Sequence, residues 1–290
     1  MFHKSILISV LFLISLTNLT AQMGSLIRYT SSYAMFPDTA RIKGHDYNGK
    51  NFDALTHYSD SSILIYIPKI FSAKAKINLV FWFHGWGNMI ETACKQFQLL
   101  EQFDESARNA VFVFPEGPKN APDSYGGKLE QPEVFQNLIK EVLSKLVEHR
   151  LMDALPLANV INYEITLTGH SGAYRVISKI INKNPVNEVI LFDAMYGGND
   201  EYLNWLSSSK HRFINIYTKE GGTFENSKWV MKKLSDSLQI PMISINEEEI
   251  TGQLLLDNKK IFIFSNMGHN EVITHNRNFA EFLRKPITSK

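Results

Sequence analysis

One serine in the chain lies in a run of very small residues, as a nucleophilic serine requires. Residues 169–173, read G-H-S-G-A, follow a β-rich stretch and precede a segment with apolar residues at helical spacing. Small residues two places before and after Ser171 let such a strand-to-helix turn close, and the strained turn exposes the serine hydroxyl. The helix behind it offers free backbone N–H groups to a developing oxyanion. The alternative is that Ser171 only caps that helix.

The apolar pattern of the chain predicts the elements that must position this serine. Residues 78–83 and 110–115 are apolar without alternation, which is typical of strands buried on both faces. Further strands are expected at 163–168, 188–192, 213–217 and 261–264, with helices at 91–102, 134–147, 201–207, 226–238 and 271–283. This alternation predicts an α/β fold in which a mostly parallel sheet carries helices on both faces.

The remaining segments predict the edge of the sheet and its openness. Residues 25–60 are polar and turn-rich, Asn48-Gly49 signals a hairpin, and residues 62–68 form a strand that ends at a proline. We expect an antiparallel ribbon there, at a sheet edge. Only about twenty residues separate Asp193 from Phe213, which leaves no room for a large cap. Residues 22–290 are interpreted as a single domain.

Residues of catalytic type follow several of the predicted strands. In an open α/β sheet, functional groups collect at the carboxyl ends of the strands. Besides Ser171, these residues are His84-Gly85-Trp86-Gly87 after strand 78–83, Asp193 after 188–192, Glu220 after 213–217 and His269 after 261–264. Serine, then acid, then histidine is the order of one known type of catalytic triad.

These motifs resemble those of the α/β-hydrolase superfamily, and of its serine esterases and lipases in particular. The resemblance covers residues 62–283 and depends on F-W-F-H-G-W-G (81–87), L-T-G-H-S-G-A (167–173) and S-N-M-G-H (265–269). It implies that Ser171 is the nucleophile and that His269 is the general base. It also implies an oxyanion hole made by the backbone N–H groups of Gly172 and Trp86.

The resemblance leaves the acid open between two residues. Glu220 follows the strand after which most members of the superfamily carry the acid. Asp193 follows the strand before it, a position used by a minority of lipase-like members, and it is the commoner residue type. A carboxylate beside Phe192 and Met195 is also unusual without a partner, so we favour Asp193. We expect His84 to orient the oxyanion loop, and His170 to face away from the serine.

The N-terminus and the composition predict an exported protein. A signal peptide is predicted over residues 1–21 from Lys4, the apolar run 6–16 and the cleavage-site residues Leu19-Thr20-Ala21. Its apolar run is too short for a stable membrane span. The alternative is that the segment is retained as an N-terminal anchor. The only cysteine is Cys94, which excludes an internal disulfide and suits a bacterial periplasm or exterior. With 30 Lys plus Arg against 29 Asp plus Glu, the chain has no electrostatic footprint for nucleic acid.

The same residues predict the chemistry and the kind of substrate. No metal-ligand spacing and no nucleotide-binding glycine motif is found, so no metal or cofactor is expected. Four residues are candidates for an aromatic rim: Trp86, Tyr125, Tyr174 and Tyr196. The alternative is that they belong to the core. We expect ester cleavage on a small or polymer-linked substrate, such as an acylated glycan. The alternatives are a peptidase or amidase on the same fold, and an exported binding protein without turnover.

Overall fold

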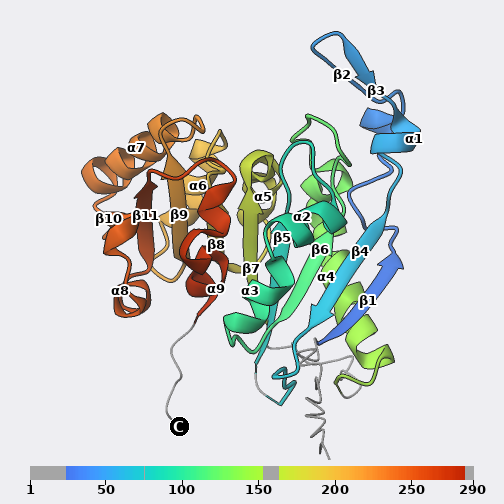
Figure 1. Cartoon of the computed structure of the whole chain (residues 1–290), viewed down its shortest axis with the longest axis horizontal. Coiled ribbons are helices and arrows are strands. Elements are labelled where there is room, and N and C mark those ends of the chain that lie inside the picture. Colours follow the sequence, from blue (N-terminus) through green and yellow to red (C-terminus); the bar gives the residue numbers. More distant parts are fainter. Residues whose placement is uncertain (1–23, 75, 153–162, 285–290) are drawn as a thin grey trace, which may run out of the picture.

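A nine-stranded sheet forms the centre of the computed structural model, which describes residues 24–74, 76–152 and 163–284 (Figure 1). The predicted signal peptide, residues 1–21, lies outside the described residues and stays a prediction. Across the sheet the strands are β1 (Ser25–Thr30), β4 (Ser62–Ile67), β6 (Val111–Pro115), β5 (Ile77–Phe83), β7 (Tyr163–His170), β8 (Val186–Phe192), β9 (Arg212–Thr218), β11 (Lys260–Ser265) and β10 (Ile243–Asn246).

Strand β4 is the exception to an otherwise parallel arrangement. It pairs antiparallel with β1 on one side and with β6 on the other, whereas the remaining neighbours pair parallel. The predicted mostly parallel sheet and the antiparallel ribbon at its edge are therefore confirmed. Because the parallel strands run in one direction, their carboxyl ends meet at a single edge of the sheet.

Both faces of the sheet are buried, which explains the apolar runs without alternation. In β5, Leu79, Phe81 and Phe83 belong to the hydrophobic cluster on one face, and Val80 and Trp82 belong to the cluster on the other. All five side chains are inaccessible to solvent. Successive strand residues point to opposite faces, so a strand covered on both sides has apolar residues at every position.

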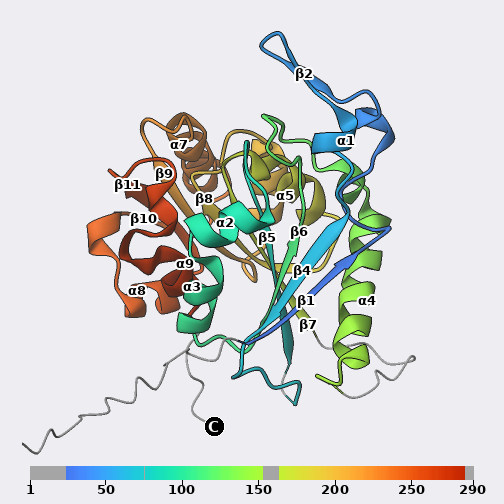
Figure 2. The same ribbon diagram turned by 45° about the vertical axis from the view of Figure 1, so that its right-hand side comes forward.

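Helices cover the two faces in two groups. One cluster includes residues of α4 (Pro132–Glu148), α5 (Tyr174–Ile181), α6 (Asn199–Leu206) and α7 (Phe224–Lys232). The other includes residues of α2 (Ile90–Gln96), α3 (Leu99–Glu105), α8 (Gly252–Asp257) and α9 (Asn278–Leu283). Figures 1 and 2 show α2, α3 and α9 in front of the sheet and α4 behind it. This is the predicted arrangement of helices on both faces.

Short helical turns complete the chain. The 3₁₀ turns are Thr39–Arg41, Gly127–Glu130, Ser171–Ala173, Glu247–Glu249, Glu271–Ile273 and His275–Arg277, and a π turn, Lys233–Ser237, extends α7. Only α6 and its flanking loops connect β8 to β9, so the described chain has no large cap at that point. No helix among the described residues is long and apolar enough to cross a membrane.

A β-hairpin projects from the edge of the sheet at which the carboxyl ends of the parallel strands meet. Strands β2 (His45–Tyr47) and β3 (Lys50–Phe52) pair antiparallel and are followed by the one-turn helix α1 (Ala54–His57). The turn residues Asn48 and Gly49 have φ of 48° and 74°, the left-handed values that a two-residue hairpin turn requires. The hairpin predicted from Asn48-Gly49 is confirmed, and in both views it extends beyond the rest of the fold (Figures 1 and 2).

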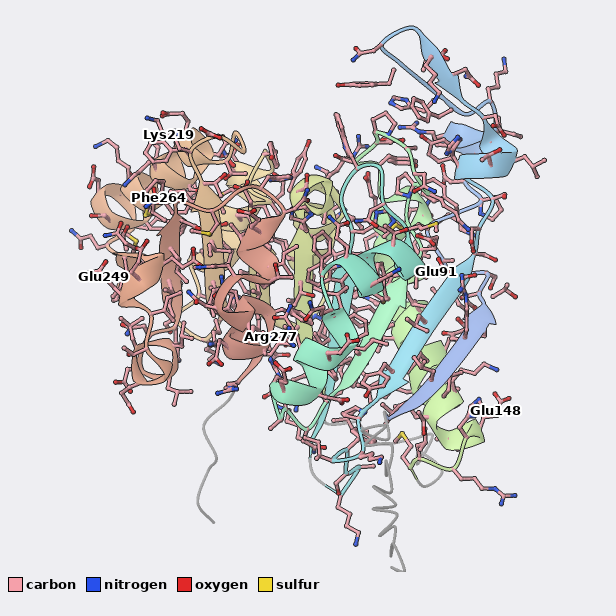
Figure 3. The ribbon with its side chains drawn as sticks, viewed as in Figure 1. Glu91, Glu148, Lys219, Glu249, Phe264 and Arg277 are labelled. Carbon is pink, nitrogen blue, oxygen red and sulfur yellow. The ribbon has the colours of Figure 1, made fainter. Side chains whose placement is uncertain are left out.

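Two predicted helices differ from the observed ones because residues with positive φ interrupt them. The stretch 91–102 divides into α2 and α3 at Gln98, whose φ is 50°. The stretch 271–283 forms two 3₁₀ turns and the short α9, with Asn276 and Arg277 left-handed at the break. The Arg277 guanidinium then pairs with Glu105 on α3 at 2.6 Å, which fixes the start of α9 (Figure 3). Strand β10 and helix α8 were not predicted.

Candidate active site

The turn that carries Ser171 is strained and tightly packed. Strand β7 ends at His170, and Ser171 follows with a φ of 54° as the first residue of the turn that leads into α5. A Cβ atom at position 169 would lie 2.6 Å from Cβ of Ala173, so only glycine fits there. The left-handed backbone conformation of Ser171 is unfavourable for a non-glycine residue by about 1–3 kcal/mol, and it persists only where the surrounding contacts hold the backbone in place. The small residues of the motif are thus required by packing.

The loop after β5 passes directly beside this turn. A Cβ atom at Gly85 would lie 2.6 Å from Cβ of Ser171 and 3.2 Å from the backbone nitrogen of Gly172. The main chain at Gly85 therefore runs alongside the nucleophile Ser171 and the backbone N–H of Gly172, one of the two predicted oxyanion donors. The Gly87 N–H donates to the carbonyl of Ala121 at 3.0 Å, which holds the outer part of the loop.

His84 fixes the loop from inside the fold, as the sequence predicted. Its side chain is buried, and its Nδ1 atom lies 2.7 Å from the Gly85 carbonyl oxygen. On the other side of the ring, Nε2 lies 3.1 Å from Oε1 of the fully buried Glu116. Because both ring nitrogens have partners within the fold, His84 orients the loop and is not available to a substrate.

Asp193 lies at the end of β8 in a dense set of hydrogen bonds. The Thr218 N–H donates to Oδ1 at 3.0 Å and the Thr218 hydroxyl to Oδ2 at 2.8 Å, while the Thr223 hydroxyl also donates to Oδ1. A side chain at Gly221 would overlap the carboxylate, which explains the glycine. Burial raises the pKa of Asp193, but the hydrogen bonds from His269, Thr223 and Thr218 outweigh burial and lower the pKa below its usual value.

His269 contacts Asp193 and not Glu220. Its Nδ1 atom lies 2.6 Å from Oδ2 of Asp193, and its side chain remains about one-third exposed. Glu220 is exposed in the loop after β9, and the preceding Lys219 lies at the outer rim of the molecule beside α7 (Figure 3). Of the two candidate acids, the fold therefore brings Asp193 to the histidine.

A buried carboxylate anchors the loop that carries His269. Glu247 accepts hydrogen bonds from the Ser265 hydroxyl at the end of β11 and from the Asn278 amide at 2.6 Å, and Nδ1 of His275 lies 2.7 Å from it. The Ser265 oxygen in turn accepts the N–H of Met267 at 3.1 Å. The loop from Ser265 to His269 is thus tied to the core at its start.

His170, which we expected to face away from Ser171, packs against His269. The two imidazole centroids are 4.5 Å apart, and Nε2 of His170 lies 3.0 Å from the backbone carbonyl oxygen of His269. On its other side the ring meets Phe97 edge-on at 5.3 Å. Burial and the neighbouring His269 lower the pKa of His170 to about 3. His170 is therefore neutral at physiological pH and holds His269 through ring packing and the contact with its backbone carbonyl oxygen.

This lowered pKa predicts a pH-dependent stability. The unfolded chain binds a proton at His170 below about pH 6.5, whereas the folded chain does so only near pH 3. Stability is therefore lost as the pH falls, by about 2 kcal/mol between pH 6.5 and 5 from this group. Urea unfolding of the wild type and His170→Gln should show a shallower pH dependence in the variant. Equal slopes in the two proteins would contradict the assignment.

Tyr196 is a member of the site that the sequence offered only as a rim residue. Its hydroxyl donates to the Gly221 carbonyl and lies 3.5 Å from Nδ1 of His269. Burial is the main cause that raises the pKa of Tyr196 to about 12, and a hydrogen bond with the Ser171 hydroxyl acts in the opposite direction. Among the described residues, Tyr196 contacts the imidazole of His269, and no hydrogen bond joins Ser171 directly to His269.

The other predicted rim residues have different surroundings. Trp86 is 46% exposed, and its indole N–H donates to the Ser124 hydroxyl at 2.7 Å. Tyr174 packs against Tyr196 with ring centroids 6.1 Å apart. Tyr125 lies between the guanidinium groups of Arg41 and Arg175, at 4.6 and 4.9 Å, and is part of the packing. No group of three or more potential metal ligands occurs among the residues that the structure describes.

The strand order and the strand-end residues together define the α/β-hydrolase fold, and comparison with solved structures agrees. The chain is similar to a ferulic acid esterase (TM-score 0.52, 10% identity, 90% of this chain and 98% of that one). It is also similar to a feruloyl esterase module from Clostridium thermocellum in complex with sinapinate (0.52, 13%, 91% and 88%). A third similar structure is the substrate-bound, fluorophosphonate-binding serine hydrolase F of Staphylococcus aureus (0.50, 10%, 90% and 97%). No protein-family model and no curated protein sequence matches the chain.

Proposed function

We propose that this chain is a serine hydrolase that cleaves carboxylic esters through an acyl-enzyme on Ser171. In this proposal His269 is the general base and Asp193 is the acid that orients it. The observation that carries the proposal is the 2.6 Å contact between the His269 imidazole and the buried Asp193 carboxylate, beside the Ser171 turn. A carboxylate on Nδ1 fixes the tautomer in which Nε2 is free to accept a proton.

The reaction then has two halves. The Ser171 oxygen attacks the ester carbonyl carbon while its proton passes to His269, and the tetrahedral oxyanion is bound by the N–H groups of Trp86 and Gly172. The proton leaves His269 for the departing alcohol as the ester C–O bond breaks. A water molecule next attacks the acyl carbonyl carbon and gives a proton to His269. The bond between the acyl carbon and the Ser171 oxygen then breaks, and His269 returns the proton to that oxygen, which releases the carboxylic acid and regenerates Ser171.

The contacts of Tyr196 describe the resting state in this scheme. Catalytic hydrogen bonds are often long before substrate binds and shorten in the Michaelis complex. In this proposal the Ser171 side chain changes rotamer when substrate binds and turns its hydroxyl toward His269. Because burial raises the pKa of Tyr196, its hydroxyl stays protonated at neutral pH and does not compete with His269 as a base.

An ester on an extended substrate fits the openness of the site best. Only α6 and its loops separate β8 from β9, and the side chains of both Trp86 and His269 are partly exposed. Similar folds occur in proteins described as ferulic acid and feruloyl esterases. At 10–13% identity this likeness supports the fold, and the ester preference remains part of the proposal.

Labelling with a fluorophosphonate tests the proposal directly. The probe phosphonylates an activated serine, so the wild type should be labelled and Ser171→Ala should not. Ser144→Ala, which removes an exposed hydroxyl on α4, is the matched control and should be labelled like the wild type. Turnover of a panel of 4-nitrophenyl esters and matched anilides then compares ester with amide cleavage. Absence of labelling in the wild type would remove the hydrolase proposal.

A further inference from the structure

The projecting hairpin brings an exposed aromatic ring to the edge of the proposed active site. Tyr47, the last residue of β2, lies with its ring centroid 5.2 Å from that of Trp86 at an interplanar angle of 74°. Tyr47 is 37% and Trp86 is 46% exposed. The His45 ring lies 6.5 Å from the Tyr47 ring, centroid to centroid, at an interplanar angle of 29°. The hairpin and the loop after β5, which are far apart in the chain, thus contribute to one row of rings.

Trp86 connects this row to the nucleophile. A Cβ atom at Gly172, the residue after Ser171, would lie 2.7 Å from Cδ1 of Trp86, so the indole rests directly on the nucleophile turn. The hydrogen bond to Ser124 fixes the orientation of the indole. The row therefore extends outward from the reacting serine, through Trp86, to Tyr47 on the hairpin.

The hairpin is built to hold Tyr47 in place. The Asn51 amide donates to the Asp46 carboxylate at 2.8 Å across the two strands. The Phe52 ring meets His57 of α1 edge-on at 5.2 Å, and His57 lies 2.6 Å from the Lys119 carbonyl oxygen in the main body. A short hairpin gains little stability by itself, and these contacts tie it to the rest of the chain.

The geometry of the pair selects the kind of ligand that it can bind. Two rings edge-to-face at 5.2 Å are already in contact, so no flat acyl group can insert between them. A fatty acyl chain favours an enclosed apolar cavity, whereas these two rings are open to solvent. A sugar chain fits because its C–H groups are attracted to the negative faces of aromatic rings. Its hydroxyl groups can stay in water or meet polar neighbours such as Ser124.

We propose that Tyr47 and Trp86 form a platform for the carbohydrate part of an acylated polysaccharide. The platform holds the sugar chain so that an ester attached to it reaches Ser171. The role of the platform in substrate choice depends on the proposed function. Carbohydrate binding at the platform does not require turnover. The two proposals can therefore fail separately.

Binding to a polysaccharide array, with Ser171→Ala as the background to prevent turnover, tests the platform. We expect binding to at least one polysaccharide on the array, and Tyr47→Ala should weaken that binding about tenfold. Tyr47→Phe keeps the ring and should bind like the parent. Trp229→Ala removes an exposed tryptophan on α7 and is the matched control. If no polysaccharide is bound, or if Tyr47→Ala binds like the parent, the platform is wrong.

Kinetics on active protein then connect binding to substrate choice. For an acylated form of the bound polysaccharide, kcat/KM relative to that for 4-nitrophenyl acetate should fall about tenfold in Tyr47→Ala. An unchanged ratio would remove the role in substrate choice. If the wild type binds carbohydrate but is not labelled by the fluorophosphonate, the platform proposal is supported and the hydrolase proposal is contradicted. Far-ultraviolet circular dichroism and thermal unfolding of each variant show whether the fold is intact.

Discussion

Asp193→Asn is expected to lower kcat for ester hydrolysis on the order of 10⁴-fold. The amide keeps the size of the side chain but cannot orient the His269 tautomer or stabilise the imidazolium that forms during attack. KM should change much less, because Asp193 is fully buried and does not reach the substrate. Initial rates on a 4-nitrophenyl ester across a range of concentrations give both constants.

Glu220→Gln is the matched control for this experiment. It makes the same chemical change at the other candidate acid, which is exposed in the loop after β9. Its activity should stay close to that of the wild type. A large loss in Glu220→Gln with little effect in Asp193→Asn would mean that the loop after β9 rearranges to supply the acid. Thermal unfolding of both variants separates lost catalysis from lost structure.

Gly85→Ala is expected to lower kcat by about 10²- to 10³-fold, the usual loss for one oxyanion donor. The new methyl group would lie 2.6 Å from Cβ of Ser171, so either the loop that carries the Trp86 N–H or the nucleophile turn must move. A displaced donor costs transition-state stabilisation, which appears in kcat. Stopped-flow measurement of the acylation burst shows whether the acyl transfer step is the one affected.

Gly252→Ala provides the control for a glycine substitution as such. Nothing lies within 4 Å of the Cβ atom that it would add, and Gly252 is the first residue of α8. We expect normal activity and, because alanine restricts the unfolded chain, unchanged or slightly higher stability. If Gly85→Ala were equally active, the loop after β5 could not supply an oxyanion donor at the observed position.

The fold was largely predictable because its signals are local and strong. Strand β6, and strand β5 from Leu79 to Phe83, are apolar at every position, and that pattern alone indicates burial on both faces. The helix boundaries that failed depend on single residues, such as Gln98 and Asn276, that adopt positive φ without being glycine. Strand β10 alternates between apolar and polar residues, I-S-I-N, but over four residues only, which is too short for periodicity to distinguish it from a loop.

The sequence predicts which strands carry the candidate site residues at their carboxyl ends, but it does not predict the contacts between those residues. Whether Asp193 or Glu220 meets His269 depends on three hydrogen-bond donors, from Thr218 and Thr223, that converge on one carboxylate in space. The sequence does hold a signal that was not used: the run T-K-E-G-G-T, residues 218–223, places two threonines and two glycines where a neighbouring acid needs donors and room. Tyr47 gave no signal at all, because its partner is 39 residues away along the chain.

The pairing of β7 with β8 has a consequence for how the protein becomes active. His170 and Phe192 are register partners at the ends of the two strands. Ser171 and Asp193 are the residues that directly follow, so the backbone ladder brings them to neighbouring positions. His269 arrives from β11, which is separated from β8 by β9. Recovery of turnover after denaturation therefore reports when the C-terminal third of the chain docks, even if the sheet around the serine has formed long before.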